Sequence, residues 1–336
     1  MGAIVGGIIL FALGAIARLA PAIARRGRGD PGRTPADTRY ADGHGRPGPR
    51  EAARRPAARR ATSSERRDMA DLDVTRADAV LIGGGIASAT LAAMLTELEP
   101  DWDIVVLERL DSLGAESSDA WNNAGTGHSA LCELNYTPQD VDGSVSPAKA
   151  IAINEQFQVS RQFWPHLVEN DRIGDPSRFI HTVPHMSFVH GMENADYLRR
   201  RHEALVANPL FDRMEFTTEH ARLAEWAPLV SEGRPVTETI AATWSPDGTD
   251  VDFGALTREM LDFASRAGTT VATGSEVVDL RRMGNDWGVM VRSTADDSLR
   301  VVRAPFVFVG AGGYALPLLQ KSGIEEIRGF GGFPIS

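Results

Sequence analysis

An α/β fold built around a Rossmann-like dinucleotide-binding unit is what this sequence predicts, and three features within residues 79–108 carry the prediction. An apolar run, Ala79–Ile82, enters the glycine turn Gly83-Gly84-Gly85. A helical pattern follows, with apolar side chains at Leu91, Met94, Leu95 and Leu98. A second apolar run, Ile104–Leu107, ends on Glu108, 23 residues beyond Gly85. These are the parts of a dinucleotide-binding βαβ unit, and an ordinary βαβ unit without a ligand is the alternative.

Each residue of this unit has an expected role. Gly83 permits the tight turn, Gly84 continues it, and Gly85 lets the backbone approach a pyrophosphate. A helix starting near Ile86 offers N–H groups and its positive dipole end to that anion. Glu108 can accept hydrogen bonds from ribose hydroxyls, and Ser88 replaces the third glycine of the pattern while still allowing close packing. The motif does not separate FAD from NAD.

The segment that follows separates these cofactors better. It contains the run Trp-Asn-Asn-Ala-Gly-Thr-Gly-His-Ser-Ala-Leu-Cys-Glu-Leu-Asn-Tyr-Thr-Pro at 121–138. Here the chain closely resembles the malate:quinone oxidoreductase family, which is FAD-dependent. Further family-like segments stand at 159–164, 184–189, 248–254 and 309–314. The resemblance covers roughly residues 72 to 336 and is lost at both ends of the chain.

The resemblance implies a glutathione-reductase-2-like flavoprotein with an inserted α+β substrate domain. It implies oxidation of (S)-malate to oxaloacetate in the tricarboxylic acid cycle, with electron transfer to a membrane quinone. Such an enzyme, a quinone-dependent malate dehydrogenase, is expected as a peripheral protein on the cytoplasmic face of the bacterial inner membrane. Two alternatives remain open: a related FAD-dependent oxidase or dehydrogenase of 2-hydroxy or amino acids, and an inactive truncated fragment.

Candidate site residues follow from the chemistry that the resemblance implies. Removing the hydroxyl proton of malate needs a base, and a histidine is suited to it. His128 is the first candidate base, and His185 is the second; a structural histidine is the alternative at each position. The expected flavin contacts are Asn122, Asn123, Gly125 and Thr126, with a locally capped loop as the alternative. Further expected cofactor contacts are Val277 and the second glycine turn at Gly310, Ala311 and Gly312, which a ligand-free strand-to-helix turn also explains.

The predictions about substrate and metal binding rest on residue type. A dicarboxylate substrate calls for an arginine, because its planar guanidinium binds carboxylates bidentately. Arg161 and Arg258 stand in family-like segments and are the candidates, although a surface role is the favoured interpretation of each. No metal site is expected, since the eight histidines show no paired ligand spacing. The single cysteine, Cys132, excludes an intrachain disulfide and suits a reducing compartment.

The N-terminal part of the chain differs from the rest. Residues 1–70 carry 14 arginines and 6 acidic residues (+8), whereas the remainder carries 21 basic and 39 acidic residues (−18). Residues 1–17 are uncharged and mostly apolar, at the short limit for a membrane span. The Arg- and Pro-rich residues 29–68 cannot bury a core and have too few aromatics to indicate nucleic-acid binding. We expect either a true start at Met69 or a membrane anchor, within residues 1–24, with a disordered linker.

The remaining elements are predicted in chain order. A helix is expected over 148–172, a strand over 178–190 broken by Pro184, a helix over 194–208, an extended stretch over 211–216 and a helix over 218–226. A helix over 253–267 ends at Gly268; strands follow at 269–272 and 274–280, then a meander, then the apolar strand Phe306–Val309. We assign 71–150 to the FAD-binding unit and flavin loop, 151–245 to a substrate domain, and 246–336 to the return to the FAD-binding domain. Family members continue further, so impaired activity is expected of this chain.

Overall fold

The computed structural model describes residues 72–327 of the chain, with the exception of the side chain of Glu326. The extension over residues 1–70, with its apolar segment, its linker and the start at Met69, lies outside the described residues. The same holds for residues 328–336.

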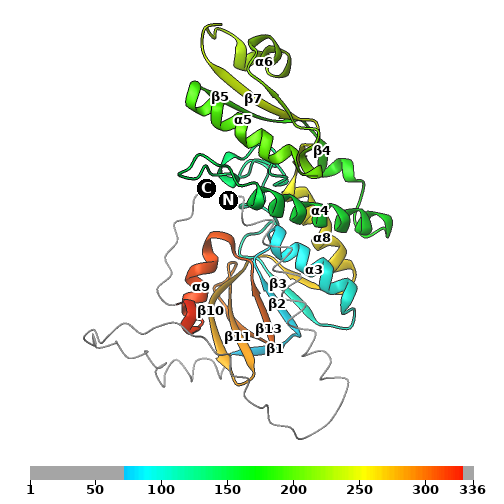
Figure 1. The fold of residues 1–336 in the computed structure, drawn as a ribbon. Coiled ribbons are helices and arrows are strands. Elements are labelled where there is room, and N and C mark those ends of the chain that lie inside the picture. The colour runs from blue at the N-terminus through cyan, green and yellow to red at the C-terminus, as the bar shows by residue number, and fades with distance from the viewer. Residues whose placement is uncertain (1–71, 328–336) are drawn as a thin grey trace, which may run out of the picture. The chain divides into compact units, whose positions relative to one another are not determined.

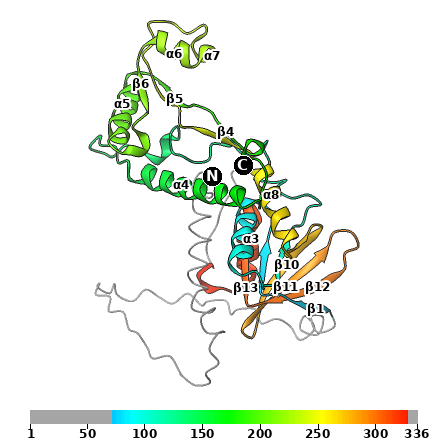
Figure 2. The same cartoon turned by 90° about the vertical axis from the view of Figure 1, so that its right-hand side faces the viewer.

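A four-stranded parallel sheet forms the centre of the predicted dinucleotide unit (Figure 1). Its order is β13 (Phe306–Val309), β2 (Ala79–Ile82), β3 (Ile104–Leu107) and β9 (Thr270–Ala272). All four residues of β2 are buried, as expected for an inner parallel strand covered on both faces. Helices α3 (Ile86–Leu98) and α8 (Phe253–Arg266) pack side by side against the sheet (Figures 1 and 2).

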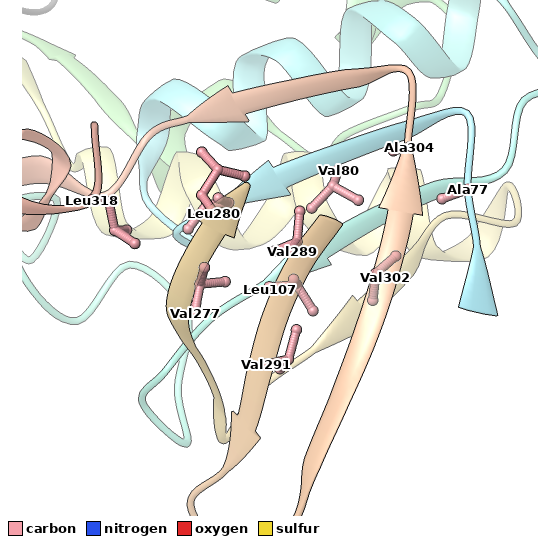
Figure 3. Close-up of a cluster of buried hydrophobic side chains, with 11 residues drawn as sticks. Ala77, Val80, Leu107, Val277, Leu280, Val289, Val291, Val302, Ala304 and Leu318 are labelled. Atoms are coloured by element: carbon pink, nitrogen blue, oxygen red, sulfur yellow. The ribbon is translucent and has the colours of Figure 1, made fainter. Parts of the chain in front are cut away.

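A second four-stranded sheet packs against the first. Its order is β1 (Asp73–Arg76), β12 (Leu299–Ala304), β11 (Asp286–Ser293) and β10 (Ser275–Met283). Apolar side chains from both sheets fill the space between them, including Val80, Leu107, Leu280, Val289 and Val302 (Figure 3). Alternation along the strands of this sheet places every second side chain in that core. The burial of apolar surface therefore fixes how the sheets face each other.

The remaining elements form smaller sheets flanked by helices. An antiparallel sheet has the order β5 (His185–His190), β7 (Ile240–Ser245) and β6 (Glu215–Thr217), and β4 (Ile180–Thr182) pairs with β8 (Thr249–Val251). Helix α5 (Met192–Val206) packs on this antiparallel sheet (Figure 1). The other helices are α4 (Ala148–Glu169), α6 (His220–Trp226), α7 (Pro228–Ser231) and α9 (Ala315–Lys321), with short 3₁₀ turns at Leu134–Tyr136, Pro176–Arg178, Pro209–Phe211, Gly312–Tyr314 and Glu325–Ile327.

Most predicted elements are confirmed, with one error. The strands β1, β7 and β8 and the short helices α7 and α9 were not predicted from the sequence. Strand β1 is short and polar, and its only strand partner is β12, more than 220 residues away, so no local pattern marks it. The predicted extended stretch over 211–216 was wrong at its start, where a 3₁₀ turn, Pro209–Phe211, precedes β6. The side chain of Asn208 accepts a hydrogen bond from Leu210 N and caps that turn.

We predict that Leu280→Ala lowers the free energy of unfolding by about 2–5 kcal/mol, because it removes buried side-chain atoms from the core between the two sheets. The matched control is Leu299→Ala in the same sheet, where the side chain is 41% exposed. This control should change stability by no more than about 0.5 kcal/mol. Chemical denaturation followed by circular dichroism measures both, and equal losses would contradict the assignment of this core.

Candidate functional site

The two predicted glycine turns lie against each other. Strands β2 and β13 are parallel neighbours, and Gly310 N donates to Ile82 O at 2.8 Å. Gly83 has φ +98°, which favours glycine, and a Cβ there would stand 2.5 Å from Gly310 O. Only glycine therefore allows the turn after β2 to approach the turn after β13 this closely.

Helix α3 begins at this contact. A Cβ on Gly310 would collide with the buried Ser88 hydroxyl, so the small residues at both positions allow the close packing of helix and strand. Gly85 is the N-cap of α3 and has no capping side chain of its own, so the first N–H groups of the helix lack intrahelical partners. In the second glycine turn, Gly312 also has a positive φ, +50°. A short helical turn, Gly312–Tyr314, directly follows Ala311.

Glu108 faces the same turn. Its carboxylate accepts hydrogen bonds from Gly84 N at 2.5 Å and from Leu110 N at 2.8 Å. Each carboxylate oxygen keeps a further lone pair, so it can still accept a hydrogen bond from a ribose hydroxyl. The structure thus brings the turn after β2, the start of α3 and the acid after β3 together, as the sequence predicted.

Ser118 belongs to this site and was missed by the sequence analysis. Its hydroxyl accepts a hydrogen bond from Ile86 N at 2.9 Å, and its side chain is buried. A serine hydroxyl beside a helix N-terminus can also donate its own proton to an anion held there. Its position in the family-like segment after Glu108 was the available signal, but nothing local indicated that this loop folds back onto α3.

Val277 contributes its side chain to the core between the two sheets. The start of its strand is nevertheless bonded to the backbone of Glu108, because Ser275 N donates to the carbonyl oxygen of Glu108 at 2.7 Å. Any contact of Val277 with a ligand would therefore come from its backbone. Its cofactor role stays a prediction.

The asparagines of the expected flavin loop bond within the loop itself. Asn122 Nδ2 donates to Glu116 O at 3.0 Å, and Asn123 Nδ2 donates to Asp119 O at 2.7 Å. Asn123 Oδ1 accepts from Gly125 N at 3.0 Å. These bonds agree with the alternative of a locally capped loop, so flavin contact by these two side chains stays a prediction.

The loop then joins the dinucleotide unit to the smaller sheets. Gly125 O accepts from Val251 N of β8 at 2.7 Å, and Thr126 Oγ1 donates to Glu133 Oε1 at 3.2 Å. Gly127 has φ +63°, and a Cβ there would stand 2.5 Å from the Phe157 ring of α4. This backbone approach leaves no room for a side chain at Gly127.

His128 stands in the left-handed region at φ +59°, an uncommon backbone conformation for a residue other than glycine. Its side chain is half-buried, and its Nδ1 is buried without a hydrogen-bond partner among residues 72–327. Burial lowers the pKa of His128 from its ordinary value, while the charge of Glu133 opposes this shift. A neutral imidazole is the form that can accept a proton.

His185, the second candidate base, has partners on both ring nitrogens. Nε2 lies 2.9 Å from Thr249 O, and Nδ1 lies 3.9 Å from Cys132 Sγ. The ring is buried and packs against Gly248. These contacts favour the structural alternative for His185.

The two predicted substrate arginines lie on different helices and are exposed. Arg161 of α4 has its guanidinium 6.0 Å from the centroid of the Phe157 ring, and Arg258 of α8 lies near Gly254. No contact joins the two side chains. Their substrate role stays a prediction.

A different arginine, missed by the sequence analysis, is fully buried beside the loop. Arg201 Nε donates to Thr137 Oγ1 at 2.9 Å, and its Nη2 lies 3.3 Å from both Ala130 O and Leu131 O. It stands in a run of three arginines, which is typical of a solvated helix face. It lies three residues after Leu198 and four residues before Leu205, and this spacing was the signal that places it on the buried face of α5.

Among residues 72–327, no three His, Cys, Asp or Glu side chains are grouped so that they could hold a metal ion. Within the same residues, none of the helices combines the length and the apolar character that crossing a bilayer requires.

Comparison with known proteins identifies the family. The family model described as malate:quinone oxidoreductase matches residues 75–336. The chain belongs to the malate:quinone oxidoreductase family. The resemblance seen in the sequence is thereby confirmed.

Two curated relatives illustrate the match. A probable malate:quinone oxidoreductase from Rhodococcus jostii (strain RHA1) is 56% identical over 263 residues, covering 78% of this chain and 52% of the relative. One from Kocuria rhizophila (strain ATCC 9341 / DSM 348 / NBRC 103217 / DC2201) is 57% identical over 262 residues, covering 77% of this chain and 53% of the relative. The chain therefore spans about half the length of these malate:quinone oxidoreductases.

Solved structures confirm the fold class. The structure of L-alpha-glycerophosphate oxidase from Mycoplasma pneumoniae with FAD bound has a TM-score of 0.56 and 13% identity, covering 74% of this chain and 57% of that chain. Glycine oxidase from Geobacillus kaustophilus has a TM-score of 0.54 and 19% identity, covering 74% of this chain and 58% of that chain. At these identities the likeness concerns the fold alone, which is the predicted Rossmann-like α/β fold of FAD-binding proteins.

We predict that Cys132 is unreactive in the folded chain. Burial, with the nearby Glu133 charge, raises the pKa of the Cys132 thiol to about 12. At pH 8 only about one thiol in ten thousand is then ionised. Since the chain has one cysteine, reaction with a disulfide reagent reports on it alone. Modification should be at least about a hundredfold slower than in guanidinium-unfolded protein; equal rates would contradict a shielded thiol.

Proposed function

We propose that this chain carries the FAD-binding and part of the substrate-binding structure of an enzyme that oxidises (S)-malate to oxaloacetate and passes the electrons to a membrane quinone. Membership of the malate:quinone oxidoreductase family supports the proposal. The observation that carries it is the meeting of the Gly83 and Gly310 turns, the N-terminus of α3 and the Glu108 carboxylate in one place.

The residues present fit FAD. The first N–H groups of α3 and the Ser118 hydroxyl would bind the diphosphate, where backbone and a small side chain leave close access. Glu108 would accept hydrogen bonds from the adenosine ribose. The segment containing Asn122, Asn123, Gly125 and Thr126, together with Gly310–Gly312, is the proposed surround of the rest of the cofactor.

When bound, the flavin supplies the two-electron oxidation chemistry that side chains lack. The proposed task of His128 is to take the proton of the malate C2 hydroxyl. Its lowered pKa suits this task, because the imidazole stays neutral at physiological pH. The segment bearing His128 is fixed by α4 and α5: Asn154 Nδ2 donates to Ser129 O at 2.7 Å, and Arg201 bonds the next two carbonyls. Such anchoring holds the backbone that follows His128 in one position, which favours the fixed orientation that a catalytic base requires.

The malate carboxylates require cationic partners, and Arg161 and Arg258 remain the proposed ones. Both guanidiniums are exposed and so are free to bind an anion bidentately. Because quinones reside in the bilayer, we also propose peripheral association with the cytoplasmic face of the bacterial inner membrane.

The proposed function predicts that the purified protein is yellow and binds FAD. Under anaerobic conditions malate should bleach the flavin absorbance. A quinone analogue should then restore this absorbance, whereas NAD should not restore it. Because the chain spans about half the length of its relatives, the protein extended to their full length is assayed beside it. Extended protein that is colourless, or yellow but indifferent to malate, would refute the proposal.

We further predict that His128→Asn lowers kcat for malate by about 10²–10⁴-fold while FAD content is unchanged, because a general base contributes that much. The matched control is His181→Asn on β4, where the side chain is exposed. The control should keep its activity, measured as malate-driven quinone reduction. If the two variants are equally active, His128 is not the catalytic base.

A further inference from the structure

Several buried side-chain atoms in and around the segment that bears the proposed base have no hydrogen-bond partner within the described part of the chain. They include Ser129 Oγ and Arg201 Nη1 as well as the two atoms that matter most here, His128 Nδ1 and Glu133 Oε2. A buried polar atom without a partner carries a substantial free-energy cost, of about 1–3 kcal/mol. Such atoms call for an explanation. His128 Nδ1 is a potential hydrogen-bond donor, and Glu133 Oε2 is an acceptor.

The backbone holds both residues in one short, anchored segment. His128 and Ala130 both have φ +59°, so the chain turns sharply between the two side chains. Three other elements hold the segment: α4 through Asn154, α5 through Arg201, and β5 through Ser187, whose hydroxyl donates to Cys132 O at 2.8 Å. Left-handed residues held by their surroundings are typical of functional sites.

The charges around Glu133 are few. Its Oε1 accepts from Thr126 Oγ1 at 3.2 Å. The neighbouring Cys132 thiol and the Tyr136 phenol stay neutral, since burial together with the Glu133 charge raises the pKa of each to about 12. On the far side of Cys132 stands His185, already bonded to Thr249 O.

Arg201 is a cation that acts on this group from α5. Its Nε and Nη2 donate to Thr137 Oγ1 and to the carbonyls of Ala130 and Leu131, whereas its Nη1 is buried without a hydrogen-bond partner among the described residues. Glu133 acts electrostatically on both Arg201 and His128. The Glu133 carboxylate can therefore have one of two roles: it is the counter-ion of Arg201, or it is the hydrogen-bond partner of the His128 imidazole.

We propose that Glu133 is a positioning residue for His128. The Nδ1–H of the imidazole donates to one water molecule, which donates in turn to Glu133 Oε2, and this arrangement leaves Nε2 as the proton acceptor. This inference rests on the proposed function. The proton of the malate hydroxyl would bind to Nε2 while Nδ1 keeps its proton; a bound flavin would supply the two-electron oxidant that accepts the C2 hydrogen as a hydride. The Glu133 carboxylate then stabilises the imidazolium that forms.

The direct test is the titration of His128 in protein labelled with ¹⁵N-histidine, followed by NMR. A carboxylate favours the protonated imidazole, so Glu133→Gln should lower the pKa of His128 by about one unit. The resonance is assigned by its loss in His128→Asn. The matched control is Glu215→Gln, which removes an exposed carboxylate paired with Arg222 and should leave His128 unchanged. If Glu133→Gln leaves the titration unchanged and lowers only thermal stability, Glu133 is the counter-ion of Arg201 and the proposal is wrong.

A kinetic readout complements the titration. With the neutral imidazole as base, kcat/KM for malate falls as pH drops through the pKa of His128. In Glu133→Gln this acid limb should move to lower pH by about the same unit, and the plateau should fall at least about tenfold. If no variant oxidises malate, the proposed function fails, while the NMR titration still decides whether Glu133 governs His128.

Discussion

The close approach of two glycine turns is the constraint on which the rest of this structure depends. Gly83 follows β2 and Gly310 follows β13. A Cβ on Gly83 would collide with Gly310 O, and a Cβ on Gly310 would collide with the Ser88 hydroxyl. Ser88 of α3 packs on Gly310, so the same contact fixes where the helix begins. As a consequence, the first N–H groups of α3, a serine hydroxyl and the Glu108 carboxylate lie around one small region, which is the arrangement that binding of a diphosphate and a ribose requires.

The loop that carries the family resemblance has a second structural role. It links the dinucleotide unit to the smaller sheets through Gly125 and β8, and to α4 through Gly127 and Phe157. Small residues are needed at both positions because backbone meets backbone or an aromatic ring there. The loop therefore places His128 between the cofactor-binding unit and the sheets of the proposed substrate region.

The sequence predicted the elements whose signal is local. The parallel strands, the glycine turns, α3 and Glu108 follow from apolar runs and periodicity, and all appear as predicted. Strands β1 and β8 were missed because each is short and acquires its strand partner from distant sequence. Ser118, Glu133 and Arg201 were missed for a related reason: each owes its position to tertiary contacts. Arg201 shows this most clearly, since it is buried while Arg199 beside it is paired on the surface.

The most direct measurement of the central claim is a crystal structure of the flavin-loaded protein, with the distance from the diphosphate oxygens to the first backbone nitrogens of α3. We expect distances within about 3.2 Å, the range of a hydrogen bond, together with a ribose hydroxyl bonded to Glu108. A diphosphate bound away from α3, with the Gly83 and Gly310 turns free of ligand, would contradict the account.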